Sequence, residues 1–272
     1  MIDPETIADL IRQTAKAVIL PRFRALAPEE IREKNPGDFV TIADTDAEEM
    51  LSRLLTQALP GSVVCGEEGV ARDNAALAVL DGTAPVWVLD PVDGTGNFAH
   101  GRTGFTVIVA LVENGVTLAG WIHEPLTGAT VHARRGGGAW IDGQRVAVDA
   151  ARPLTAQHGS AYGQLAKRGA ACKVLGASGA VAGVRNTGCG GLDYIMMARG
   201  ETHFKYSSVS LPWDHAAGIL IMSEAGAVAR FADGAPYSLH RHDSPLLIAP
   251  NEANWQALHA LLSGEAALTP PC

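Results

Sequence analysis

The chain has 272 residues, of which 47% are hydrophobic and 18% are charged, and its formal net charge is −8. This length and apolar content are enough to bury a large core, as one domain or as two closely packed ones. No segment is rich in Lys and Arg, so nucleic acid is not an expected partner, because binding to that polyanion depends on basic patches.

The sequence predicts neither export nor insertion into a membrane. The segment 1–5 lacks the basic and apolar regions of a signal peptide, and no apolar run is long enough to span a bilayer. The four cysteines form no Cys-x-x-Cys pair, which argues against a zinc site or a redox couple. We therefore expect a cytoplasmic protein without a membrane partner.

The first elements are helical. Asp3 and Pro4 are typical of a helix start, and the apolar spacing that follows predicts a helix that ends by Pro21. A second helix is expected over 46–59. Asp44 precedes it, and from the sequence alone it is interpreted as an N-cap.

A short buried strand is predicted at 63–65, and it leads into Gly66, Glu67 and Glu68. Adjacent glutamates are typical of a solvated turn. In α/β proteins, however, binding sites form in the loops at the ends of strands, so a functional role for this pair stays open.

The stretch 86–98 is the most informative part of the sequence. A buried strand over 86–89 is expected to end at Asp90, because Pro91 cannot donate a hydrogen bond to the sheet. Asp93 follows, and then Gly94-Thr95, where glycine permits a tight turn. Two carboxylates on one short loop repel each other, and a hard divalent cation such as Mg²⁺ would relieve that repulsion.

The next segments predict an antiparallel sheet. Asn114-Gly115 and Asp142-Gly143 are hairpin signals. The run 136–138 lacks the Lys-Ser/Thr ending of a phosphate-binding P-loop and is interpreted as a turn. The strands within 150–183 are not placed, apart from a strand end near the substrate at Gly159-Ser160. The expected strands are 105–112, 116–122, 130–133 and 139–141.

The last third predicts two helices near the site. The first has a glycine-rich start at 188–191 and ends near Gly200. Its free backbone N–H groups could hold substrate hydroxyls or an anion, and the alternative is close packing through small residues. The second begins at Pro212 and carries Asp214 in its first turn. Strands at 227–230 and 246–249 and a helix from residue 251 follow, and 269–272 form a tail.

Taken together, four motifs resemble those of the inositol monophosphatase family, in the family's order. The resemblance covers nearly the whole chain and implies a layered α/β fold of alternating helix pairs and β-sheets, similar to that of fructose-1,6-bisphosphatase, and usually a homodimer. We expect one domain over 1–272, or two sub-domains at about 1–145 and 146–272. The motifs are Asp38-x-Val40-Thr41-x-x-Asp44, Gly66-Glu67-Glu68, Asp90-Pro91-x-Asp93-Gly94-Thr95-x-Asn97-Phe98 and Trp213-Asp214-x-Ala216-Ala217-Gly218.

The resemblance also implies a magnesium site and a reaction, the hydrolysis of a small phosphate monoester without a covalent intermediate. Asp44 and Thr95 would orient and deprotonate the attacking water, assisted by Glu67. The implied ligands for two or three Mg²⁺ ions are Glu67, Asp90, the carbonyl of Val92, Asp93 and Asp214. Lithium sensitivity is expected, since Li⁺ can replace one Mg²⁺.

The implied substrate contacts are less complete. They are Asp93, Gly94, Thr95, Gly188, Cys189, Gly190 and Ser207. Inositol phosphatases carry a glutamate, which binds inositol hydroxyls, at the position of Ser207, so its absence weakens inositol monophosphate as the specific substrate. Related enzymes act on histidinol phosphate, fructose bisphosphate or phosphoadenosine phosphate.

Two other classes compete with this interpretation. A phosphatase of the haloacid dehalogenase type, which uses an aspartyl nucleophile, needs Asp-x-Asp, whereas Asp90 and Asp93 are three positions apart. A non-catalytic metal-binding protein is the other alternative. The Asp90 loop lacks the closing glutamate of an EF-hand, and a degenerate family member would usually have lost a metal ligand, whereas none is lost here.

Overall fold

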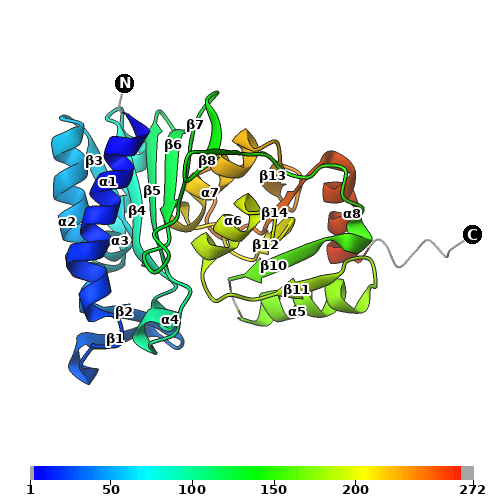
Figure 1. The fold of residues 1–272 in the computed structure, drawn as a ribbon, viewed down its shortest axis with the longest axis horizontal. Helices are drawn as coiled ribbons and strands as arrows, with labels where there is room; N and C mark the ends of the chain where they lie inside the picture. The colour runs from blue at the N-terminus through cyan, green and yellow to red at the C-terminus, as the bar shows by residue number, and fades with distance from the viewer. Residues whose placement is uncertain (1–2, 164, 265–272) are drawn as a thin grey trace, which may run out of the picture.

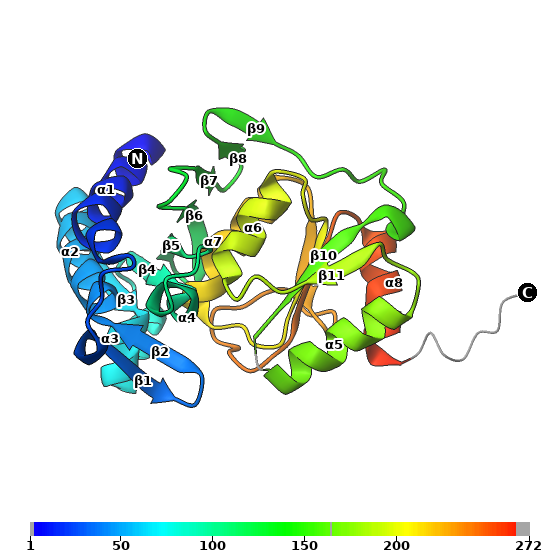
Figure 2. The ribbon, with the colours of Figure 1, turned by 60° about the horizontal axis from the view of Figure 1, so that its bottom comes forward.

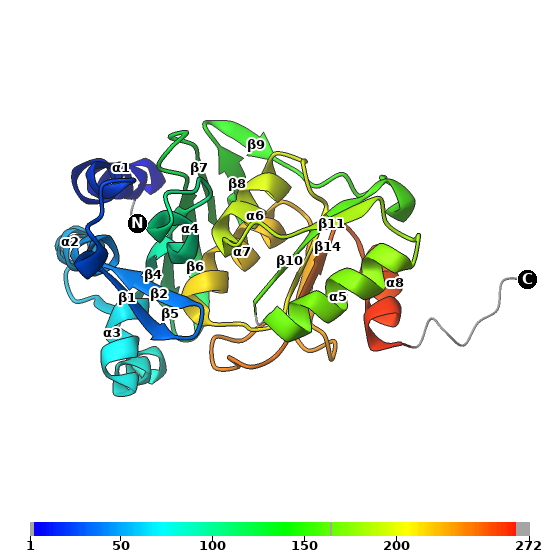
Figure 3. The same ribbon diagram turned by 90° about the horizontal axis from the view of Figure 1, so that it is seen from below.

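A computed structural model describes residues 3–163 and 165–264. It has five layers: a helix pair, a seven-stranded sheet, a second helix pair, a five-stranded sheet and a third helix pair (Figures 1 and 3). The helix pairs are α1 (Pro4–Thr14) with α2 (Ile42–Ala58), α6 (Gly190–Ala198) with α7 (Pro212–Glu224), and α5 (Leu165–Ala177) with α8 (Glu252–Ser263). The expected layered α/β fold is confirmed. No helix in the described ranges is long and apolar enough to cross a membrane.

The seven-stranded sheet runs in chain order from β3 to β9. Only β3 and β4 are parallel, and the remaining neighbours are antiparallel. Both predicted hairpin turns are confirmed, and at each of them two successive residues have positive φ. The strands are β3 (Val63–Gly66), β4 (Val86–Asp93), β5 (Thr106–Glu113), β6 (Val116–His123), β7 (Thr130–Arg134), β8 (Gly138–Ile141) and β9 (Gln144–Val146).

Strand β4 differs from its prediction, because it does not end at Asp90 but continues to Asp93 and is buried throughout. Its pairing with β5 is interrupted between Asp90 and Asp93, where the register shifts. Pro91 has no N–H to donate, and the strand accommodates it as an irregularity within the ladder rather than as an end. This irregularity carries both carboxylates. Gly94, with φ of 86°, then ends the strand before the short helix α4 (Thr95–Ala99).

Helix α2 begins earlier than predicted. Thr41 is the N-cap, since its hydroxyl oxygen accepts a hydrogen bond from the N–H of Ala43. Asp44 lies in the first turn and accepts from the N–H of Thr41, which completes a capping box. The interpretation of Asp44 as the N-cap is therefore wrong. Its carboxylate points back across the start of the helix.

The hairpin of β1 (Ile31–Asn35) and β2 (Asp38–Thr41) lies beside α4 at one end of the molecule (Figure 2). Helix α3 (Glu67–Arg72) follows β3, and a 3-10 segment at Asn74–Asp81 leads to β4. Helix α1 continues as a π-helical turn and a 3-10 turn through Arg22, so the helical path passes the predicted end at Pro21 by one residue.

The five-stranded sheet has the order β11-β10-β12-β14-β13, and β10 is parallel to both of its neighbours. The suggested strand end at Gly159-Ser160 falls inside β10. Strand β10 and helix α5 lie in the region 150–183, whose strands the sequence did not place. Gly159 shows why, since a Cβ atom there would lie 2.0 Å from the ring of Phe204. The strands are β10 (His158–Tyr162), β11 (Gly183–Arg185), β12 (Phe204–Ser207), β13 (Val228–Phe231) and β14 (Leu246–Ala249).

Candidate metal and substrate site

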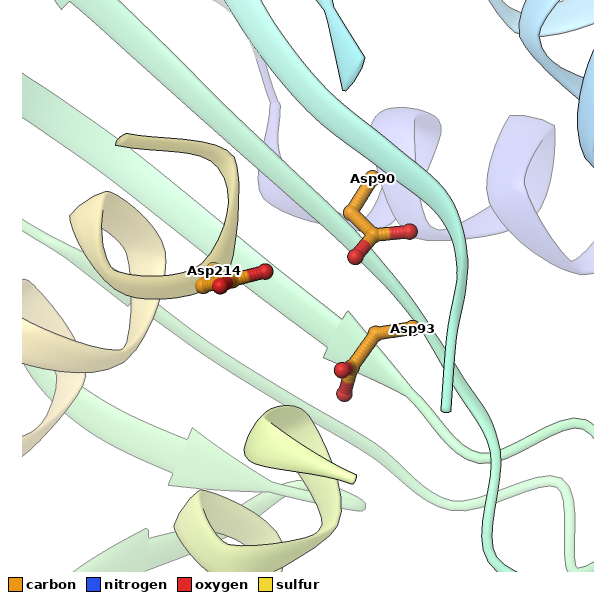
Figure 4. A group of neighbouring side chains, drawn as sticks. All are labelled: Asp90, Asp93 and Asp214. Atoms are coloured by element: carbon orange, nitrogen blue, oxygen red, sulfur yellow. The ribbon is translucent and has the colours of Figure 1, made fainter. Parts of the chain in front are cut away.

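Three buried aspartates converge where β4 meets α7. Asp90 and Asp93 lie at the end of β4, and Asp214 lies in the first turn of α7. Each offers one carboxylate oxygen, and these three oxygens lie within 4.8 Å of one another. In Figure 4 the three side chains point into one common space. The structure thus brings together residues 124 positions apart in the chain, counting from Asp90 to Asp214.

The electrostatics of this cluster favour a cation. Burial, followed by the charges of Glu67 and Asp93, raises the pKa of Asp90 well above its usual range. Burial and the charge of Asp93 do the same to the pKa of Asp214. Within the described ranges Asp214 accepts no hydrogen bond, and Asp90 accepts one, from the N–H of Val92 at 3.0 Å. Buried carboxylate oxygens with few or no hydrogen-bond donors, as at Asp90 and Asp214, fit Mg²⁺, so the residues present suit that ion.

Asp93 is oriented by the glycine-rich start of α6. Its carboxylate accepts the N–H groups of Gly190 at 3.1 Å and Gly191 at 2.6 Å, and the thiol of Cys189 at 2.9 Å. The hydroxyl of Thr106 adds a bond of 3.0 Å. The helix start thus holds an anion, but this anion is a side chain of the protein. The same glycines allow close packing, since a Cβ atom at Gly191 would lie 2.2 Å from the Thr106 hydroxyl.

Glu67 begins α3 and faces the same space. Its carboxylate lies 2.8 Å from the ammonium group of Lys34, which comes from the β1–β2 hairpin. Lys34 also lies 3.1 Å from Glu68. Lys34 was not predicted from the sequence. An isolated lysine in a polar hairpin carries no local signal of the carboxylates that it meets.

Asp44 and Thr95 form a pair beside the aspartates. The Thr95 hydroxyl lies 3.1 Å from Oδ1 of Asp44 and 3.0 Å from the carbonyl oxygen of Val92, and its single proton can be donated to one of them at a time. The other Asp44 oxygen accepts from the hydroxyl of Thr41 at 2.6 Å. Burial raises the pKa of Asp44 to about 7. A carboxylate with this pKa is suited to accept a proton near neutral pH.

Most of these groups border one cavity of about 990 Å³, which is large enough for a small phosphate ester. Asp44 is not part of its lining but lies 3.1 Å from the hydroxyl of Thr95, which is. The walls come from both halves of the chain. The first half supplies Lys34, Glu67, Asp90, Asp93, Gly94, Thr95 and Arg102, and the second half supplies Tyr162, Asn186, Gly188, Leu211 and Asp214.

Ser207 and Tyr162 differ in their relation to this cavity. Ser207 is buried, and its hydroxyl donates to the carbonyl of Val209 at 2.7 Å and lies 3.2 Å from the ring of His215. It is not among the residues that line the cavity. Tyr162, which was not predicted from the sequence, does line it. The charge of Asp214, followed by burial, raises the pKa of the Tyr162 phenol well above its usual value.

Comparisons with known proteins identify the family of this chain. The inositol monophosphatase family model matches residues 3–266. The chain is 33% identical over 238 residues to the inositol-1-monophosphatase of Rhizobium meliloti, with 86% of each chain covered. It is 30% identical over 208 residues to the fructose-1,6-bisphosphatase/inositol-1-monophosphatase of Thermotoga maritima, covering 72% of this chain and 73% of that protein.

A solved structure shows the same fold. The Thermotoga maritima IMPase superposes with a TM-score of 0.83 at 23% identity, and 97% of each chain is covered. The sequence match spans almost the entire chain, and the fold likeness is equally complete. The protein therefore belongs to the inositol monophosphatase family, whose members are phosphatases that hydrolyse phosphate monoesters.

Proposed function

We propose that this phosphatase hydrolyses a small phosphate monoester of a polyol or sugar in a Mg²⁺-dependent reaction, with inositol monophosphate as the first candidate. The observation that carries the proposal is that three buried carboxylates and Thr95 line one cavity, while Asp44 lies within hydrogen-bond distance of the Thr95 hydroxyl. The names of the two relatives above support a polyol or sugar as the alcohol.

In this proposal Asp90, Asp93 and Asp214 would hold one ion, and Glu67, Asp90 and the carbonyl of Val92 would hold another. Glu67 would also hold a third ion through water. When bound, the ions would neutralise the phosphate dianion and acidify a water molecule. Li⁺ would inhibit by taking one of these places. The Val92 carbonyl and the Glu67 carboxylate already have partners, Thr95 and Lys34, which would have to yield or share these oxygens.

The remaining steps belong to residues of the chain itself. The Thr95 hydroxyl would orient the attacking water, and Asp44 would accept its proton, with Glu67 supporting the same water. The backbone N–H groups of Gly94 and Thr95 would hold the phosphate. Gly94 suits this close approach, because its φ is positive and a Cβ atom there would lie 2.8 Å from the carbonyl oxygen of Gly104.

The alcohol part of the substrate would lie against Gly188, Cys189 and Gly190 and near Ser207. Because residue 207 is a serine, this side lacks the carboxylate that would favour inositol hydroxyls. The Ser207 hydroxyl donates its hydrogen bond to the carbonyl of Val209. Histidinol phosphate, phosphoadenosine phosphate and fructose bisphosphate are therefore alternative substrates for the same chemistry. The name of the Thermotoga relative supports fructose bisphosphate among them. We also propose a homodimer that acts in the cytoplasm.

The test is phosphate release from these four esters and glycerol 2-phosphate, with Mg²⁺ and with a chelator. Asp90→Asn should lower Mg²⁺-dependent release by about 1,000-fold, since Asp90 is shared between both proposed ions. Asp81→Asn, at a side chain that is 75% exposed, is the control and should leave the rate unchanged. Release that persists in the chelator, or in Asp90→Asn, would contradict the proposal. No release from any ester would favour a non-catalytic role.

A further inference from the structure

We propose that Tyr162 is a substrate-contacting residue, whose phenol donates a hydrogen bond to the oxygen that bridges phosphorus and the alcohol. We further propose that Lys205 is the positioning residue that holds its ring. This inference rests on the proposed function and deepens it, because it concerns the leaving group of the same reaction.

The position of Tyr162 is the first support. It is the last residue of β10, at the carboxyl end of a strand with parallel neighbours, and it lines the cavity. A Cβ atom built on Gly190 would lie 3.5 Å from Cζ of Tyr162 and 3.7 Å from Oδ1 of Asp93. The hydroxyl end of the ring therefore lies beside the acidic cluster. Its oxygen has no hydrogen-bond partner within 3–163 and 165–264, so it can serve a ligand.

The second support is the way in which the ring is held. The ammonium group of Lys205 lies 4.9 Å from the ring centre of Tyr162 and 5.0 Å from that of Tyr194. Lys205 is buried, and it is fixed by Asp193 at 2.7 Å and by the carbonyl of Gly190 at 3.3 Å. A buried cation between two aromatic faces gives a strong, directional contact. It holds Tyr162 in register with α6, the helix that orients Asp93.

The third support is the half of the chain from which Tyr162 comes. Thr95, a proposed partner of the attacking water, belongs to the cavity lining built by the first half of the chain, and Asp44 lies 3.1 Å from its hydroxyl. Tyr162 belongs to the lining built by the second half, as Asp214 does. In phosphoryl transfer the attacking and leaving oxygens lie roughly in line through phosphorus. In the proposed arrangement the bridging oxygen would therefore lie on the side of phosphorus away from Thr95, where the phenol of Tyr162 would meet it.

The reaction balances without a change in Tyr162. The oxygen of water forms a bond to phosphorus, and the bond from phosphorus to the bridging oxygen breaks and leaves its electron pair on that oxygen. The attacking water loses one proton and the bridging oxygen gains one, so an alcohol and phosphate result. Tyr162 keeps its own proton and donates a hydrogen bond as charge develops. The benefit is largest for alkyl esters, whose leaving alkoxide is a poor anion.

The experiment compares an alkyl and an aryl ester in Tyr162→Phe. We expect kcat/KM for glycerol 2-phosphate to fall by about 100- to 1,000-fold, as for the loss of one donor to a developing oxyanion. For p-nitrophenyl phosphate it should change little, because nitrophenolate leaves without such help. The ratio of the two values is independent of the fraction of folded protein. Tyr206→Phe is the matched control, since Tyr206 lies in the same sheet but does not line the cavity.

The outcomes separate this inference from the proposed function. Wild-type protein inactive on both esters would contradict the proposed function and this inference with it. Active wild-type protein whose ratio is the same in Tyr162→Phe would overturn this inference alone, whether both rates fall equally or neither falls.

The role of Lys205 is tested by the same ratio. Lys205→Met should lower the ratio of kcat/KM for glycerol 2-phosphate to that for p-nitrophenyl phosphate, as Tyr162→Phe does, because the ring of Tyr162 loses the cation that holds it. Lys205→Arg, which keeps a cation between the rings, should restore most of it. If Lys205→Met lowers the melting temperature and leaves the ratio unchanged, Lys205 is only structural.

Discussion

The two sheets build one cavity from different kinds of sequence. The wall on the side of the seven-stranded sheet carries Asp90, Asp93 and Thr95, with Asp44 bound to Thr95, and all four lie in short motifs. The wall on the side of the five-stranded sheet carries Tyr162, from a strand without a motif. The reactive groups therefore depend on local sequence, whereas the proposed substrate wall depends on how distant segments pack.

Helix α7 connects the two walls. It is buried from Pro212 to Met222, and it packs on β6, β7 and β5 while contacting α6 and β13. Close approach is possible because both sides use small residues. A Cβ atom at Gly120 in β6 would lie 2.7 Å from Cα of Ala217, and one at Gly218 would lie 2.3 Å from the ring of Tyr194. The position of Asp214 is thereby set by packing that involves both halves.

The largest expected effect on stability comes from a substitution that disturbs the packing of α7. Gly218→Ala should lower the free energy of unfolding by about 3 kcal/mol, because the added methyl group overlaps the buried ring of Tyr194. Gly176→Ala in α5 is the matched control. A Cβ atom at Gly176 would meet no neighbour within 4 Å among the described residues, and alanine should stabilise that helix by about 0.5 to 1 kcal/mol. Denaturant unfolding of both variants measures the difference.

Equal effects of the two alanines would contradict the tight packing of α7. A second readout is the affinity for Mg²⁺ in the folded Gly218→Ala protein. If α7 positions Asp214, this affinity should fall, whereas Gly176→Ala should keep the wild-type value.

A smaller effect on stability tests how Glu48 fixes the start of α3, which carries Glu67 on the wall beside the seven-stranded sheet. Glu48 lies one turn after Asp44 in α2, and its buried carboxylate accepts the N–H of Glu68 at 2.8 Å, so it caps the helix that begins with Glu67. Burial raises the pKa of Glu48 to about 7. Between about pH 7 and pH 4.5 the folded protein keeps a proton on Glu48, whereas the same carboxyl group is ionised in the unfolded chain. This group therefore makes the fold more stable as the pH falls through this window.

The corresponding experiment follows unfolding of metal-free protein between about pH 8 and pH 5.5. Glu48 should contribute a gain of about 2 kcal/mol over this range, and Glu48→Gln should lack that part because its amide does not titrate. Identical pH dependence in the two proteins would show that Glu48 is not the group responsible. Other buried carboxylates, such as Asp44, would remain in both and cancel in the comparison.

The difference between the walls also explains what the sequence could predict. Both hairpins and the pair of carboxylates at Asp90 and Asp93 followed from local patterns, whereas the layers and the role of Asp214 followed from the family resemblance. Asp44 and Pro91 were misjudged because propensity favours an N-cap and a strand end, whereas the capping box with Thr41 and the irregular pairing with β5 decide these positions. The bounds of strand β10 could not be placed, because its small residues fit against Phe204, a partner 45 positions away from Gly159.

The smallest expected effect concerns Ser207, where the sequence suggested a substrate contact and the structure shows a hydroxyl bound to Val209. Ser207→Ala should cost about 1 kcal/mol of stability, because the buried carbonyl of Val209 loses its donor. The ranking of phosphate esters should stay as in wild type, since the cavity wall is unchanged. A selective loss of one ester would instead show that Ser207 reaches the substrate when it binds. In that case the second wall would rearrange on binding, and specificity would not be readable from its resting packing.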